Sequence, residues 1–103
     1  MYLLVFYVPA TEAERVKRAL FEAGAGKIGA YQECSWEVLG EGQFRPMEGS
    51  IPFLGSEGEL ERVAELRVEM VVEESLVEKG VKALLETHPY EEPAYHVLKT
   101  VNY

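Results

Sequence analysis

The sequence predicts one α+β domain over residues 1–103, of the ferredoxin-like βαββαβ type, with a four-stranded antiparallel sheet and two helices on one face. Three observations support this prediction. A chain of 103 residues has the length of a single domain. Strand-forming segments alternate with segments whose apolar residues follow helical spacing. A shift of 64 residues also aligns the two halves, placing Thr11 on Ser75, Ala13 on Val77, Glu14 on Glu78 and Leu20 on Leu84.

The first half consists of a predicted strand followed by a predicted helix. Residues 2–8 are strand formers with apolar side chains on both faces, which is typical of a central strand, and Pro9 ends it. Thr11 and Glu14 have the spacing of a capping box, and Gly24 predicts the end of the helix. The predicted buried stripe of this helix consists of Ala13, Val16, Ala19, Leu20 and Ala23.

A second strand is predicted over residues 31–39, followed by a loop over residues 40–58. This loop contains five glycines and two prolines and has little periodicity. Loops of more than about 12–15 residues are uncommon in small domains unless they bind something or are disordered. The lone cysteine, Cys34, excludes an internal disulfide and is expected to be a packed thiol in the second strand.

The second half repeats the pattern of strand, helix and strand. Residues 65–72 alternate cleanly, with Leu66, Val68, Met70 and Val72 expected to face the core. Ser75 and Glu78 form a second capping box, and Pro89 ends the helix that it opens. This helix is expected to bury Val77, Val81, Leu84 and Leu85, and a last strand is expected over residues 94–101.

This arrangement leaves one face of the sheet without a covering helix. Because residues 2–8 are apolar on both faces, something is expected to cover that face, and a second copy of the chain is the simplest cover. A homo-oligomer is therefore predicted.

The formal net charge of −8 disfavours nucleic acid and anionic membranes as partners, because ten basic residues are scattered among eighteen acids. No apolar window is long enough for a membrane-spanning helix. The N-terminal apolar run is too short for a signal peptide and lacks a preceding basic region, so a cytoplasmic protein is expected.

The segment 88–96 is the densest cluster of functional groups. His88, His96, Glu91 and Glu92 could supply nitrogen and oxygen ligands to a divalent metal ion. The alternative is structural: His88 ends the helix near its negative pole, and the acids lie in solvent or at a subunit contact. Tyr90 is a candidate ligand contact in the same segment, although buried tyrosines mostly serve in packing.

A second, weaker cluster spans residues 40–46. Its glycines could let the backbone approach an anion, and Arg45 could hold a carboxylate or a phosphate. The alternative is that Arg45 pairs with a surface acid. No catalytic residue is predicted, since the sequence contains no nucleophile elbow, no zincin motif and no plausible triad around Cys34.

Several strings together resemble a known family. They are Gly24-Ala-Gly-Lys-Ile-Gly-Ala-Tyr31, Gly42-Gln-Phe-Arg-Pro46, Met47-Glu-Gly49, Pro52-Phe-Leu-Gly55 and His88-Pro-Tyr-Glu-Glu-Pro-Ala-Tyr95. Over essentially its whole length the chain resembles the PII/CutA-like domain inserted in many NGG-interacting-factor-three (Nif-three) proteins, which are hexamers with a dinuclear metal centre.

This resemblance implies a ferredoxin-like fold, assembly as a homotrimer and a ligand-sensing role for the loop over residues 40–58. The two-metal site of those proteins lies in their surrounding main domain, and none of its ligands maps onto this chain. We therefore expect a free-standing version of the accessory domain.

Three functions are compatible with these observations. The favoured one is a non-catalytic, oligomeric binding or regulatory module that holds a divalent metal ion or a small ligand at clefts between subunits. The alternatives are a metal-dependent, hydrolase-like enzyme with His88, Glu91 and Glu92 as ligands, and a structural protein that docks on a partner through residues 40–58.

Overall fold

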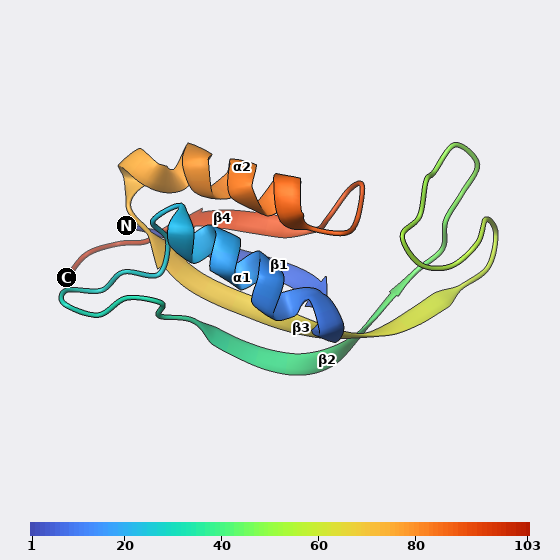
Figure 1. Ribbon diagram of the computed structural model, residues 1–103, viewed down its shortest axis with the longest axis horizontal. Coiled ribbons are helices and arrows are strands. Elements are labelled where there is room, and N and C mark those ends of the chain that lie inside the picture. The colour runs from blue at the N-terminus through green and yellow to red at the C-terminus, as the bar shows by residue number, and fades with distance from the viewer.

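The computed structural model describes residues 1–103 and contains one antiparallel sheet and two α-helices. Its elements are β1 (Tyr2–Pro9), α1 (Ala13–Glu22), β2 (Trp36–Phe44), β3 (Glu61–Val72), α2 (Val77–Thr87) and β4 (Tyr95–Lys99). The strand order is β2-β3-β1-β4, and both helices lie on the same side of the sheet (Figure 1). The predicted ferredoxin-like α+β fold is confirmed.

The hydrophobic core fills the space between the helices and one face of the sheet. Alternate residues of β1 and β3 point into it, as the strand period of two requires. The core includes Leu4, Phe6 and Val8 of β1, Val16 and Leu20 of α1, Val68, Met70 and Val72 of β3, and Leu84 of α2. The predicted inward faces of β3 and α1 are confirmed, except that Ala19 and Leu66 are only partly buried.

The buried stripe of α2 differs from the prediction. Leu85 is 46% exposed, and the fully buried positions are Gly80 and Leu84. A Cβ at Gly80 would lie 4.0 Å from side-chain atoms of Leu20 and Val72, at ordinary van der Waals distance, so this position of α2 faces the core. The 80/84 stripe of α2 thus faces the sheet, and Leu85 faces solvent.

Neither predicted capping box forms. A 3-10 turn precedes each helix, Ala10–Glu12 before α1 and Glu74–Leu76 before α2, and neither helix has a side-chain cap. Thr11 and Ser75 lie inside these turns, so they are not at the N-cap positions that the box requires. The repeat itself is confirmed, since the two turns and the two helix starts differ by the same 64 residues.

The second strand lies further along the chain than predicted. Residues 31–35 precede β2 and do not pair with β3. Gly26 bonds to the end of β3 instead: its N–H donates to the carbonyl oxygen of Val71 at 2.7 Å, and its own carbonyl oxygen accepts the N–H of Cys34 at 2.8 Å. Cys34 is consequently a half-buried residue before β2, not a strand residue. Gly40–Phe44 belong to β2 and pair with β3, which shortens the predicted loop from residues 40–58 to residues 45–60.

The paired β2 and β3 form an arm that extends past the helices and carries the loop at its end (Figure 1). The molecule measures 46 × 25 × 24 Å, and its radius of gyration of 14.5 Å exceeds the roughly 13 Å expected for a compact domain of this length. Its accessible surface of 6801 Å² likewise exceeds the roughly 5,800 Å² typical of a compact monomer of this size. Neither helix is long and apolar enough to span a membrane.

Candidate ligand-binding cleft

A cavity of about 340 Å³ lies between the arm, the loop over residues 45–60 and the segment 88–94 that joins α2 to β4. Aromatic rings and prolines form most of its apolar wall: Phe44, Phe53, Tyr90, Pro46 and Pro52. Segments 42–46, 52–53 and 90–94 thus meet at one place, although up to about fifty residues separate them in the sequence. Sequence reasoning treated 40–46 and 88–96 as two separate candidate sites.

His88 attaches the segment 88–94 to the sheet. It is 6% exposed, its Nε2 lies 2.6 Å from the carbonyl oxygen of Tyr7, and its Nδ1 accepts the backbone N–H of Tyr90 at 3.1 Å. The Nδ1 contact requires the proton on Nε2, which therefore donates to Tyr7. Burial lowers the pKa of His88 below its usual value, so the ring is neutral at pH 7.

Tyr90 connects the segment to β3. Its hydroxyl donates to Oε2 of Glu65 at 2.9 Å, and its ring packs against Phe44 and Phe53 with centroid separations of 5.8 and 6.4 Å. Burial, followed by the hydrogen bond to Glu65, raises the pKa of Tyr90, so the phenol stays protonated. The expected packing role is therefore present, and the ring also lines the cavity.

Gly42 makes room for the Glu65 carboxylate. A Cβ at this position would overlap the carboxylate, with 2.5 Å to its Cδ. The glycine in β2 is therefore the reason that Glu65 can lie across the arm and reach Tyr90. Sequence reasoning missed Glu65 as a site residue; the alternation of β3 indicated that it faces away from the core, but not which side chain it meets.

The loop is fastened by its own hydrogen bonds and by one contact with the segment 88–94. Arg45 donates from Nη1 to the carbonyl oxygen of Gly58 at 2.9 Å, and the Gly58 N–H donates to Pro46 at 2.7 Å. Glu91 accepts the backbone N–H of Ile51 at 2.7 Å. Arg45 therefore closes the base of the loop and does not line the cavity. It pairs with no surface acid, and its role in holding an anion stays a prediction.

The four predicted metal ligands do not come together in one chain. His88 has both ring nitrogens engaged, and His96 lies exposed on β4, with its ring edge-on to Tyr7 at 6.2 Å. Glu91 and Glu92 line the cavity. The chain contains no group of three or more histidine, cysteine or acidic side chains placed to hold a metal ion. A metal site completed by a second subunit stays a prediction.

Negative charge dominates the cleft. The carboxylates of Glu65, Glu91 and Glu92 line it together with the aromatic rings, and no lysine, arginine or histidine side chain does. None of the three carboxylates takes part in an ion pair within the chain.

The fold is that of a PII/CutA-like domain. CutA1 from Pyrococcus horikoshii superimposes with a TM-score of 0.71 at 19% identity, covering 100% of this chain and 86% of that protein. The PII-like protein CutA from Nostoc sp. PCC 7120 gives a TM-score of 0.68 at 21% identity, covering 97% of this chain and 81% of that one. Likeness at this level of identity establishes the fold alone.

Proteins that are similar in sequence identify the relatives of this chain more closely than the shared fold does. A Bacillus cereus protein related to NIF3 has a TM-score of 0.83 and 44% identity, over 98% of this chain and 26% of that one. Proteins described as GTP cyclohydrolase 1 type 2 homolog match from Halalkalibacterium halodurans (46% identity, 99% of this chain, 27% of the relative) and Mycobacterium tuberculosis (48%, 94% and 26%). No protein-family model matches.

Over nearly its whole length the chain therefore matches one segment of NIF3-related proteins, and its fold is that of a PII/CutA-like domain. The predicted resemblance is confirmed. The chain spans about a quarter of the length of the relatives that it matches.

Proposed function

We propose that this domain is a non-catalytic binding or regulatory module that self-associates and holds a small ligand in the cleft between the loop 45–60 and the segment 88–94. The observation that carries the proposal is the convergence of three separate segments on one cavity whose wall is fixed by hydrogen bonds. The volume of about 340 Å³ lies at the lower end of the range of small-molecule sites.

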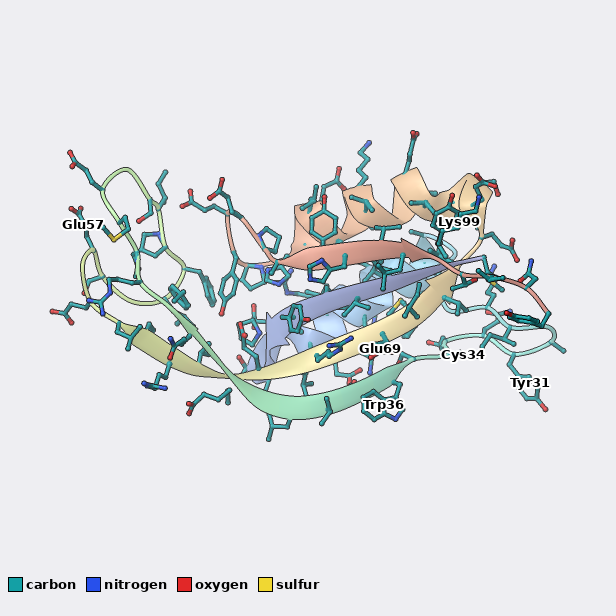
Figure 2. The ribbon with its side chains drawn as sticks, turned by 180° about the vertical axis from the view of Figure 1, so that it is seen from behind. Tyr31, Cys34, Trp36, Glu57, Glu69 and Lys99 are labelled. Atoms are coloured by element: carbon teal, nitrogen blue, oxygen red, sulfur yellow. The ribbon has the colours of Figure 1, made fainter.

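The chemistry of the wall favours binding over catalysis. His88, the imidazole beside the cleft, has both ring nitrogens engaged, and Tyr90 stays protonated against Glu65. The residues best suited to move protons near pH 7 are thus committed to holding the wall. Cys34 lies at the opposite end of the sheet from the loop that carries Glu57 (Figure 2), which excludes a cysteine nucleophile from the cleft.

Self-association is supported by the open face of the sheet, which Figure 2 shows with α1 behind it. Trp36, Val38 and Leu98 are exposed on this face, by 60%, 45% and 51%. Their exposure and the large total surface fit a protomer that is completed by further copies, with a trimer as the assembly that we propose. Because Glu65 and Phe44 lie on the same face, a neighbouring copy would border the cleft.

Native mass spectrometry of the untagged chain, purified without chelator, tests both parts of this proposal. We expect an oligomer that retains a ligand, and we expect Leu98→Lys to shift it toward monomer while the exposed control Leu85→Lys does not. Added Zn²⁺ extends the test to a divalent ion held between subunits through Glu92 and His96. A bare monomer in all conditions would contradict the proposal.

A second candidate function is docking on a protein partner through the loop 45–60. The loop exposes Met47, Ile51 and Phe53 to solvent, and an apolar loop tip is a typical contact surface. Pulldown with the intact chain and with a Met47→Ser/Ile51→Ser variant separates this function from the first, with Leu85→Ser as the matched surface control. Partner capture that depends on the loop and not on the cleft would favour docking.

A further inference from the structure

The cleft combines two features, one apolar and one charged. Its apolar wall consists of aromatic rings and prolines, and its polar groups include three carboxylates without a basic partner. Glu65 is partly buried beneath the rim, while Glu91 and Glu92 are exposed at its edge. An incoming ligand therefore meets negative charge at the mouth and ring surfaces inside.

The aromatic rings form a continuous surface, because Tyr90 touches Phe44 on one side and Phe53 on the other. The interplanar angles are 56° and 53°, so the rings are tilted and do not close on one another as a stack. Ring faces attract cations through their quadrupole, and the attraction grows when the cation is partly desolvated. Aromatic and carboxylate groups thus favour the same sign of ligand charge.

Anionic ligands do not suit this cleft. A phosphate or carboxylate would face Glu65, Glu91 and Glu92 with no lysine or arginine to hold it, since Arg45 is bound to Gly58 at the base of the loop. The guanidinium of Arg67 lies over the ring of Tyr7 and pairs with Glu69. Burying an anion beside unpaired like charges is unfavourable.

A neutral aromatic ligand or a bare metal ion uses only half of the site. The neutral ligand would leave the rim carboxylates without a partner. The metal ion would make no use of the rings, and the chain does not gather three ligands for it. An organic cation satisfies both features, because its charge can lie between the rim carboxylates while its apolar body covers the rings.

We propose that the cleft binds a small organic cation, an ammonium or guanidinium group on an apolar body, with the charge at Glu91 and Glu92 and the body against Tyr90 and Phe53. This inference rests on the proposed function, because it names the ligand class of the same cleft. It also supplies a reporter: Glu91 accepts the Ile51 N–H, so a cation that pairs with Glu91 changes the surroundings of that amide.

Three probes of matched size test the charge requirement on the full ¹⁵N-labelled chain: benzylammonium, benzyl alcohol and benzoate. We expect benzylammonium to shift the amide signals of Ile51, Tyr90 and Glu92 saturably. Benzyl alcohol is expected to bind at least about ten-fold more weakly and benzoate not to bind. Raising the salt from 50 to 300 mM weakens benzylammonium binding by a few-fold, because the rim carboxylates are exposed.

Matched variants locate the charge. Glu92→Gln is expected to weaken benzylammonium binding about two- to five-fold, while Glu57→Gln, at the exposed tip of the loop (Figure 2), leaves it unchanged. Equal binding of benzyl alcohol or benzoate at the same amides overturns the cation inference and leaves the cleft as a ligand site. If none of the probes moves those amides, or if Glu92→Gln changes only the oligomeric state, the cleft is not a free small-molecule site and the proposed function fails with the inference.

Discussion

Gly42→Ala is expected to break the link between the arm and the segment 88–94. The new Cβ would occupy the position of the Glu65 carboxylate, which must then rotate away from Tyr90. The strand itself tolerates the change, because alanine costs less backbone entropy than glycine in a strand interior. Gly40→Ala is the matched control: it lies on the same face of β2, and its Cβ would meet nothing closer than a backbone oxygen at 4.0 Å.

The size of the effect follows from two opposing contributions. A hydrogen bond to a charged group contributes roughly 1.5–3 kcal/mol, with the lower end appropriate to this partly exposed pair. The gain from replacing glycine is roughly 0.5–1 kcal/mol. We therefore expect Gly42→Ala to lower the free energy of unfolding by about 1 kcal/mol, and Gly40→Ala to leave it unchanged or to raise it slightly. Urea denaturation at one fixed protein concentration measures both, since self-association shifts the apparent stability.

A double-mutant cycle with Tyr90→Phe isolates the mechanism. In the phenylalanine background the hydrogen bond to Glu65 is already absent, so Gly42→Ala should become neutral or slightly stabilising. The coupling energy between the two positions should be about 1.5 kcal/mol. Effects that add to within about 0.5 kcal/mol would show that Gly42 does not act through Glu65 and would refute this account of the cleft.

Two further predictions concern His88 and the end of α1. Because burial lowers the pKa of His88 in the folded state, the unfolded chain takes up its proton first as the pH falls below about 6.5, and stability present at neutral pH is lost in that range. The urea midpoint should therefore fall between pH 7.5 and 5.5, and it should fall less steeply in His88→Gln. Equal slopes in the two proteins would contradict the assignment. Gly24→Ala should lower the free energy of unfolding by about 1–3 kcal/mol, because Gly24 has φ = 102° and its Cβ would lie 2.8 Å from Leu76. Gly29→Ala is the control and should lower it by less, because Gly29 has φ = 56° and open space around it. Thermal unfolding compares the two variants, and equal losses of stability would show that Leu76 plays no part.

The sequence predicted the architecture because the fold depends on patterns that are local. The alternation in residues 65–72 and the apolar run of residues 2–8 required only neighbouring positions, and the repeat at 64 residues required only a comparison of the two halves. The predictions that failed depend on how the helices and strands pack against one another, which neighbouring residues do not reveal. Leu85 has the right helical spacing for burial, but α2 turns positions 80 and 84 toward the core and leaves Leu85 exposed. Thr11 has the right neighbours for a cap, but a 3-10 turn places it before the helix start.

The candidate site was predictable only in pieces. The segments 40–46 and 88–96 were found from their composition, but the pairing of Gly42 with Val63 that brings Phe44 to Tyr90 is a property of the sheet register. Glu65 looks like an ordinary solvent-facing residue until that register is known. For Arg45, the sequence suggested an anion contact, which stays a prediction, but it gave no sign of the hydrogen bond to a backbone carbonyl that closes the loop.

The hydrogen bond between Ile51 and Glu91 joins the parts of the molecule that the two candidate functions use. On one side of it, Glu91 belongs to the cleft; on the other, Ile51 belongs to the loop whose apolar side chains are exposed. The segment 88–94 is held to the sheet through His88 and Tyr90, whereas the contact from Glu91 is the hydrogen bond that joins it to the loop. Under the proposed cation binding, a ligand that pairs with Glu91 therefore acts on the loop rather than on the sheet. Because coupling between two sites is reciprocal, a partner that binds the loop would change the affinity of the cleft by the same factor as the ligand changes the affinity for the partner.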